Sequence, residues 1–125
     1  MRNFRKLDVW NDARFLVKEV YIITSKLPSS EKFGLISQIN RCVISIPANI
    51  AEGSAKDSQK DFIRFLQFSL GSAYELESHL ILCSDLNFIE EKELNLTIDK
   101  IQILQRRISS LINTINLNFN HLPKI

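Results

Sequence analysis

Apolar residues recur along this chain at alternating spacings of three and four positions, a spacing that places side chains on one face of an α-helix. Four segments show this pattern, and three short polar breaks separate them. We therefore predict helices over about residues 8–27, 33–53, 58–87 and 90–117, with a frayed tail over residues 118–125. Because the breaks are about four residues long, successive helices should be antiparallel neighbours. The predicted fold is all-α, an up-down-up-down four-helix bundle that forms one domain over residues 1–125.

The first and third segments carry core-facing seams. Their residues are Val9, Ala13, Leu16, Val20, Ile23 and Leu27 in the first segment, and Phe62, Leu66, Ser69, Ala73, Leu76, Leu80 and Cys83 in the third. Gly71 and Ser72 interrupt the third segment near its middle. Glycine costs roughly 1 kcal/mol relative to alanine inside a helix. The pair therefore marks either a place where another backbone comes close or a tolerated glycine.

The second predicted helix contains a proline and several polar side chains within an otherwise apolar stretch. Pro47 removes one backbone hydrogen bond and clashes with the preceding turn, so we expect the helix to kink there. Gly53 is a natural C-terminal cap for the same helix. The positions at which we expect the helix kink or close packing are Pro47, Gly53, Gly71 and Ser72. At about 100° per residue the polar side chains fall on one stripe. These are Gln38, Arg41, Ser45, Asn49 and Glu52.

This polar stripe needs partners, because the rest of the helix circumference is apolar or small and must contact neighbours on several sides. Arg41 and Glu52 lie roughly 16 Å apart along the helix, so they cannot pair with each other within it. Each needs a partner from another helix, such as Glu75 or Glu77, or from another subunit. The stripe indicates either a structural network at packed interfaces or a surface on which Arg41 contacts a ligand such as nucleic acid.

Composition narrows the class of protein. A chain of 125 residues is long enough for one hydrophobic core and short for two. Cys42 and Cys83 lie in apolar helical stripes without metal-site spacing, so we expect buried thiols in a reducing compartment. The first residues lack the apolar core of a signal peptide, and no uncharged run approaches the roughly 18 residues of a membrane span. We expect a cytoplasmic protein with no membrane contact.

Charge is nearly balanced overall but uneven along the chain. The formal net charge is +2, and residues 1–70 carry 11 Lys and Arg against 7 Asp and Glu. Basic residues near the amino end are the candidates for contacts with the phosphates of a nucleic acid. These are Arg2, Arg5, Lys6, Arg14 and Lys18. No aromatic side chain is clearly displayed beside them for base stacking. The alternative is a solvated basic face.

Residues that could carry catalysis are sparse. Glu75 and Glu77 lie near His79, but a two-iron centre in a bundle needs two Glu-x-x-His pairs and two further glutamates. The only other histidine is His121, in the tail. No nucleophile with a neighbouring base and no glycine-rich phosphate loop can be assembled. We expect a non-enzymatic protein that holds no metal and no cofactor.

Spaced motifs through the first two thirds of the chain carry a family resemblance. They are Phe4-x-x-Leu7-x-Val9-Trp10, Pro28-x-x-Glu31-x-Phe33-Gly34-Leu35, Gln38-Ile39-x-Arg41, Ser45-Ile46-Pro47-x-Asn49-Ile50-Ala51-Glu52-Gly53, Gly71-Ser72 and Glu75-Leu76-Glu77. In these motifs the chain resembles the bacterial four-helix-bundle proteins that are encoded by intervening sequences in 23S ribosomal RNA genes. The match runs from Phe4 to about Leu82, and the last helix agrees in pattern only.

The resemblance implies a compact protomer that assembles into a ring-like homopentamer. It also implies association with RNA or DNA, because a similar bundle is the accessory subunit of the reverse transcriptase in diversity-generating retroelements. Leu70 stands where many relatives carry a basic residue, which lowers the charge available for phosphate contacts. The first hypothesis is a homo-oligomer that binds nucleic acid through backbone phosphates. The alternative is a structural ring that holds a partner protein, such as a reverse transcriptase, without touching nucleic acid.

Overall fold

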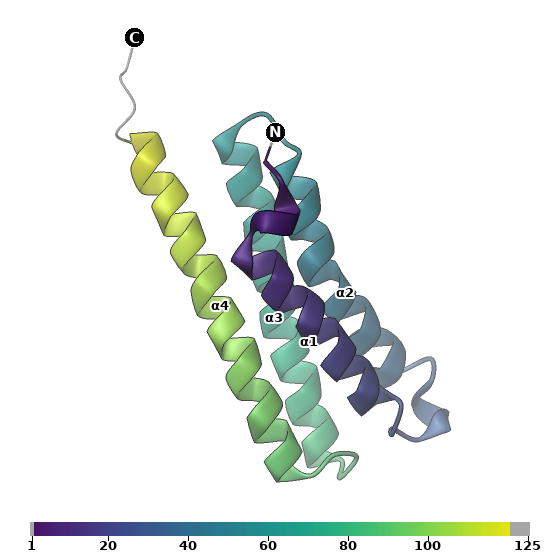
Figure 1. Cartoon of the computed structure of the whole chain (residues 1–125). Helices are drawn as coiled ribbons and strands as arrows, with labels where there is room; N and C mark the ends of the chain where they lie inside the picture. Colours follow the sequence, from purple (N-terminus) through teal and green to yellow (C-terminus); the bar gives the residue numbers. More distant parts are fainter. Residues whose placement is uncertain (1, 121–125) are drawn as a thin grey trace.

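Four long helices make up the chain in a computed structural model, which describes the backbone of residues 2–120 and the side chains of residues 2–118. They are α1 (Asp8–Thr24), α2 (Leu35–Ser54), α3 (Gln59–Asp85) and α4 (Glu91–Asn120). Short 3-10 turns precede and follow α1, namely η1 (Phe4–Lys6) and η2 (Ser29–Glu31). No strand occurs among residues 2–120, so the prediction of an all-α four-helix fold is confirmed (Figure 1). Within that range, none of the helices has the length and apolar character needed to cross a membrane.

The helix ends in the first half of the chain follow local backbone rules. α1 ends at Thr24, three residues before the predicted end, and Leu27 lies outside the helix, as expected for a residue that directly precedes a proline. α3 begins after Ser58, whose hydroxyl accepts a hydrogen bond from the backbone N–H of Asp61 at 3.0 Å. A serine in this position satisfies one of the free donors at the start of a helix.

In the second half of the chain, the main difference from the prediction is that the last helix is longer. Asn87, in the connection after α3, has a φ of 62°, a left-handed conformation that asparagine tolerates better than most residues. α4 then continues to Asn120, three residues beyond the predicted end at residue 117, and the fraying of the tail stays a prediction. Residues 121–125 of the predicted tail, with His121, lie outside the described residues.

Each helix packs against two others, so the bundle is a closed square. α1 contacts α2, α2 contacts α3, α3 contacts α4, and α4 returns to α1. Among the described residues, neither diagonal pair of helices brings Cα atoms within 8 Å of each other. The seam between α2 and α3 is the most extensive, and the seam between α1 and α4 the least. Figure 1 shows the α1–α2 and α3–α4 connections at one end of the molecule and the α2–α3 connection at the other.

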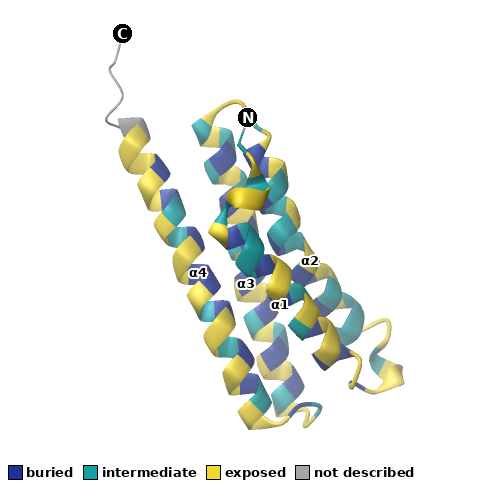
Figure 2. Ribbon diagram, in the orientation of Figure 1, coloured by how far each residue is buried: buried dark blue, intermediate teal, exposed yellow. Residues whose placement is uncertain are grey.

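The predicted seams face the core of this square. Every seam residue predicted for the first helix, from Val9 to Leu27, is buried, and so is every one predicted for the third, from Phe62 to Cys83. Figure 2 shows the buried positions along the inward side of the helices and the exposed positions on the outward side. Removal of this apolar surface from water is what holds the four helices together.

α2 continues without a break through Pro47. Because proline has no N–H, the carbonyl of Val43 loses its usual helical donor. Polar side chains of the stripe bond to the backbone nearby: the Ser45 hydroxyl donates to the carbonyl of Cys42, and the Asn49 amide donates to the carbonyl of Ser45, both at 2.8 Å. The kink at Pro47 stays a prediction.

The structure separates the two glycines at which close packing is predicted. Gly53 is not a C-terminal cap, since it lies buried inside α2 and its φ is not positive. A Cβ atom there would lie 2.7 Å from the Cβ of Phe65 and 3.2 Å from a ring carbon of Phe62, so Gly53 allows α3 to pack closely on α2. Gly71 is exposed, and no described atom would lie within 4 Å of a Cβ atom there. The close approach predicted at Gly71 is therefore not made within the described part of the chain.

Candidate functional site

Arg2 ties the amino end of the chain to the connection between α2 and α3. Its Nη1 donates a hydrogen bond to the carbonyl of Lys56 at 2.9 Å, and its Nη2 donates to Oε1 of Gln59. The guanidinium also lies 4.2 Å from the centre of the Phe62 ring. These contacts engage two of the five N–H donors of the guanidinium and one of its faces. Arg2 is therefore an anchor for the terminus, and it has fewer donors left for a phosphate than an unpaired arginine.

The other four predicted basic residues lie along η1 and the outer surface of α1. We call this set, Arg5, Lys6, Arg14 and Lys18, the basic face. All four are exposed, and none forms an ion pair with any of the described residues. The side-chain amide of Asn11 donates to the carbonyl of Arg5 at 2.9 Å, which holds η1 against the first turns of α1. The charges of the four basic side chains are thus available to a ligand.

Aromatic rings alternate with these basic side chains. The Arg5 guanidinium lies 5.7 Å from the centre of the Phe4 ring, and Phe4 packs edge-on against Trp10 with ring centres 4.9 Å apart. The Arg14 guanidinium lies 5.6 Å from the centre of Trp10 and 5.8 Å from that of Phe15. Phe4 and Trp10 are half-buried, whereas Phe15 is 62% exposed. The prediction that no aromatic side chain is displayed here is wrong. The exposure of Phe15 was visible in the sequence, because this residue lies next to Arg14 and outside the predicted apolar seam.

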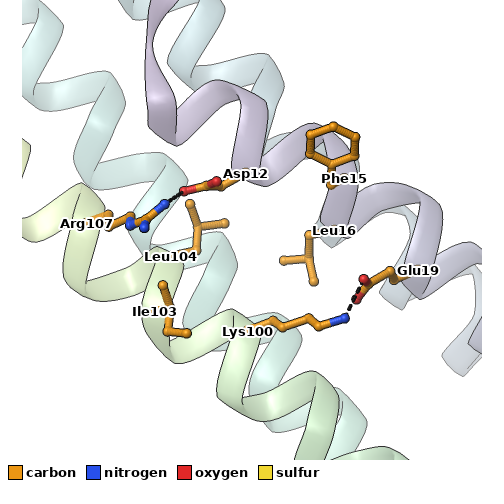
Figure 3. Close-up of a pocket in the computed structure, with 8 residues that line it drawn as sticks. All are labelled: Asp12, Phe15, Leu16, Glu19, Lys100, Ile103, Leu104 and Arg107. Atoms are coloured by element: carbon orange, nitrogen blue, oxygen red, sulfur yellow. Dashed lines mark hydrogen bonds and ion pairs between the residues drawn. The ribbon is translucent and has the colours of Figure 1, made fainter.

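A shallow groove runs beside Phe15, where the loosely packed seam between α1 and α4 leaves space (Figure 3). Leu16 of α1 and Leu104 of α4 line it and are buried. Ile103, also on α4, lines the groove and is 43% exposed. The groove is therefore apolar between the two helices and open to solvent above them.

Two ion pairs cross this groove. Lys100 of α4 donates to Oε1 of Glu19 at 2.6 Å, and Arg107 of α4 pairs with Asp12 of α1. Figure 3 shows the leucine side chains between these two pairs. Because Asp12 and Glu19 are engaged by α4, these two carboxylates do not neutralise the basic face on the same helix.

The polar stripe of α2 divides into an inner and an outer part. The hydroxyl groups of Ser45 and Ser72 lie 2.5 Å apart and join α2 to α3. Gln38, Arg41 and Glu52 are exposed, and their side chains form no hydrogen bond or ion pair with the rest of residues 2–118. The outer part of the stripe is thus a surface with two isolated charges of opposite sign.

Glu75 lies beside a thiol and an imidazole at the seam between α2 and α3. Its Oε2 is 3.4 Å from the sulfur of Cys42, and its Oε1 is 3.4 Å from Nε2 of His79, although the imidazole nitrogens lack the alignment of a hydrogen bond. Burial, and then the carboxylate of Glu75, raise the pKa of the Cys42 thiol from 9.0 to about 12. This thiol stays protonated and is therefore a poor nucleophile. No three side chains of the described residues are grouped so as to hold a metal ion.

Glu77 faces α4 rather than the charged stripe of α2. It accepts hydrogen bonds from the side-chain amides of Gln102 at 3.3 Å and Gln105 at 2.7 Å. The prediction that Glu75 or Glu77 pairs with Arg41 is therefore wrong within this chain, because both carboxylates are directed to other groups. A partner from another subunit stays a prediction.

Comparison with known proteins places this geometry in a family. The model of the family described as 23S rRNA-intervening sequence protein matches residues 5–110. A similar solved structure is the 1.70 Å crystal structure of a protein with unknown function from the S23 ribosomal protein family of Bacteroides thetaiotaomicron VPI-5482, with a TM-score of 0.78 and 25% sequence identity over 84% of this chain and 95% of that chain. No curated protein matches the chain. The family match spans most of the sequence and confirms the resemblance, so the chain belongs to the 23S rRNA-intervening sequence proteins.

Proposed function

We propose that this protein is a non-enzymatic homo-oligomer that binds nucleic acid through the backbone phosphates. The observation that carries this proposal is the basic face, in which Arg5, Lys6, Arg14 and Lys18 are exposed and have no acidic partner among the described residues. Phosphate contacts supply most of the affinity of sequence-independent nucleic-acid binding. Four free cations on one short surface match that requirement better than they match any catalytic role.

The surface of α2 and α3 supports the oligomeric part of the proposal. Arg41 and Glu52 lie there without partners among the described residues, and the apolar side chains Ile44 and Phe68 are 45% and 50% exposed. In a ring of identical subunits, Arg41 of one copy would meet an acidic residue of the next, and the apolar side chains would be covered. Repetition around a ring, which we propose to be a pentamer, would also turn each basic face into part of a continuous basic rim.

A mobility-shift assay with a structured RNA at about 50 mM and about 200 mM salt tests the binding. The wild type should bind at the lower salt and lose affinity at the higher. The double variant Arg14→Glu/Lys18→Glu should bind less tightly, with a salt slope smaller by about one for each phosphate that it no longer neutralises. Lys92→Glu is the matched control, because Lys92 is exposed at the start of α4, outside the basic face. Absence of any wild-type affinity at the lower salt would reject the proposal.

A second candidate function is a scaffold that holds a partner protein, such as a reverse transcriptase, without touching nucleic acid. The exposed apolar side chains on α2 and α3 favour it, because such a surface suits a protein partner as well as a second copy. A pull-down from cell extract before and after nuclease treatment separates the two functions. A partner protein that remains bound after nuclease treatment supports the scaffold, whereas release of the partner supports the nucleic-acid function.

A further inference from the structure

Phe15 is an aromatic side chain at a position where the outer face of a helix usually carries a polar residue. It is 62% exposed, and its ring centre lies 5.8 Å from the guanidinium carbon of Arg14. Lys18 follows one helical turn later on the same helix. Neither cation has an acidic partner among residues 2–118. Proteins that bind single-stranded nucleic acid use this combination, in which cations hold the phosphates and an aromatic ring stacks on a base.

The groove beside Phe15 fits the same ligand. Its surface between the two helices is apolar, formed by Leu16 and Leu104, and the acidic side chains of Asp12 and Glu19 are neutralised by their pairs with α4 (Figure 3). The surface around the ring therefore does not strongly repel a polyanion. The groove has a volume of about 180 Å³, below the roughly 300–1,000 Å³ of pockets that enclose small molecules. It suits the edge of one flat ring rather than an enclosed cofactor.

We propose that Phe15 stacks on an unpaired nucleobase while Arg14 and Lys18 contact the flanking phosphates, so that the nucleic acid bound here is single-stranded, as a free strand or a loop. This inference rests on the proposed function and deepens it. The faces of bases in a duplex are covered by their neighbours, and a side chain reaches one only at the cost of unstacking. An unpaired base presents its face without that cost. Because every base has such a face, we expect no sequence preference.

Fluorescence anisotropy with the full chain and three labelled probes of equal length tests this inference. The probes are oligo-uridine RNA, oligo-thymidine DNA and a blunt DNA duplex. We expect both single strands to bind more tightly than the duplex, and the two single-stranded arms show which sugar is preferred. Phe15→Ala should weaken single-strand binding by about 5- to 100-fold and leave duplex binding and the salt slope unchanged. Phe15→Leu keeps an apolar side chain without a π face and should show the same loss, which a purely hydrophobic role would not produce.

Phe33→Ala is the matched control. Phe33 is 88% exposed and its ring centre lies 5.6 Å from the Lys32 ammonium, but it belongs to the connection between α1 and α2. This variant should bind all probes like the wild type. Unchanged single-strand affinity in Phe15→Ala, or an equal loss in Phe33→Ala, would overturn the inference. A changed oligomeric mass of Phe15→Ala without nucleic acid would also overturn it, because the ring would then belong to a contact between copies.

Different results would reject the proposed function and the stacking role of Phe15. If the wild type binds none of the three probes at low salt, the proposed function is wrong and the inference falls with it. If the wild type binds duplex and single strands alike, and Phe15→Ala changes neither affinity, the phosphate contacts remain and only the stacking role is wrong.

Discussion

Lys100 donates a hydrogen bond to the carboxylate of Glu19 at 2.6 Å, which joins α4 to α1 near the middle of their seam. Two further ion pairs, Asp12–Arg107 and Lys26–Glu93, lie along the same seam. Each is seven residues from the Glu19–Lys100 pair along both segments that form the seam, one pair on either side of it. Residue numbers rise along α1 as they fall along α4, so the two helices run in opposite directions. This is the least extensively packed seam of the bundle, and every ion pair among the described residues that is not within a single helix lies along it.

The order of charges along this seam selects its register. Asp12 and Glu19 are acidic and are followed, just after the end of α1, by the basic Lys26. If α4 slid by seven positions in one direction, Glu19 would face Glu93, and in the other direction Lys26 would face Lys100. Either slip leaves the apolar seam in place but replaces three favourable pairs by one favourable pair and one contact between like charges, so the ion pairs disfavour registers that hydrophobic packing alone would tolerate.

A charge-swap cycle tests this role. Glu19→Lys should lower the free energy of unfolding by about 0.5–1 kcal/mol, because it places two cations opposite each other at a partly exposed site. Lys100→Glu should have a similar effect alone and should recover the loss when the two changes are combined. Urea denaturation at low salt measures the cycle, and the coupling should shrink near 1 M salt, where the Debye length is about 3 Å. Strictly additive losses in the double variant would contradict a direct interaction.

Substitution of the helical glycines Gly53 and Gly71 by alanine should change the free energy of unfolding in opposite directions. Gly53→Ala places a Cβ atom 2.7 Å from the Cβ of Phe65 and 3.2 Å from the ring of Phe62, both on α3, and should cost about 1–3 kcal/mol of folding free energy. Gly71→Ala meets open space and should stabilise the protomer by about 0.5–1 kcal/mol through helix propensity. Thermal or urea unfolding of dilute protein measures both. Equal effects of the two substitutions would contradict the packing difference between these positions.

The same glycines show what sequence reasoning could and could not reach. Spacing of apolar residues predicted the seams of α1 and α3 correctly, because burial of a helix follows its own periodicity. Close packing was predicted at both Gly53 and Gly71, and a helix cap at Gly53, whereas of these two positions the structure has the close packing at Gly53 alone. Whether a Cβ atom would clash depends on which residue of a distant helix lies opposite, and a single sequence does not contain that information.

The candidate site shows the same division. Local sequence placed Arg14 and Lys18 on one helix face, and the structure leaves both exposed there. The anchoring of Arg2 was not predicted, because its acceptors on Lys56 and Gln59 lie more than 50 positions along the chain. The exposure of Phe15 could have been predicted from the spacing of apolar residues in α1, since Phe15 lies outside the seam. Long-range side-chain contacts therefore account for the change at Arg2, whereas the error at Phe15 could have been avoided from the local pattern.

The buried thiol of Cys42 should make stability depend on pH in alkaline solution. Burial and Glu75 raise its pKa from 9.0 to about 12, so the folded state keeps the proton that the unfolded chain releases above about pH 9. The stabilisation is complete below the unfolded pKa and is lost as the pH rises from about 9 to about 12, at up to about 1.4 kcal/mol per pH unit.

Cys42→Ser removes this titration and keeps a small hydrogen-bonding side chain. Its free energy of unfolding should fall less steeply between about pH 9 and 10 than that of the wild type. Urea denaturation at matched pH values measures the difference in slope, and other alkaline groups cancel because both proteins contain them. Parallel slopes for the two proteins would show that the thiol ionises as readily in the folded protein as in the unfolded chain.

Pro47→Ala should change assembly rather than unfold the protomer. Alanine restores the backbone donor for the Val43 carbonyl and suits a helix interior by about 3 kcal/mol better than proline, so the helix itself should gain stability. If Pro47 bends α2, its removal shifts the exposed positions on either side, among them Arg41 and Glu52, relative to a neighbouring copy. Light scattering should then give a different oligomeric mass. Pro28→Ala, in the connection before α2, is the control and should keep the wild-type mass. A wild-type mass for Pro47→Ala would show that the proline does not shape the interface.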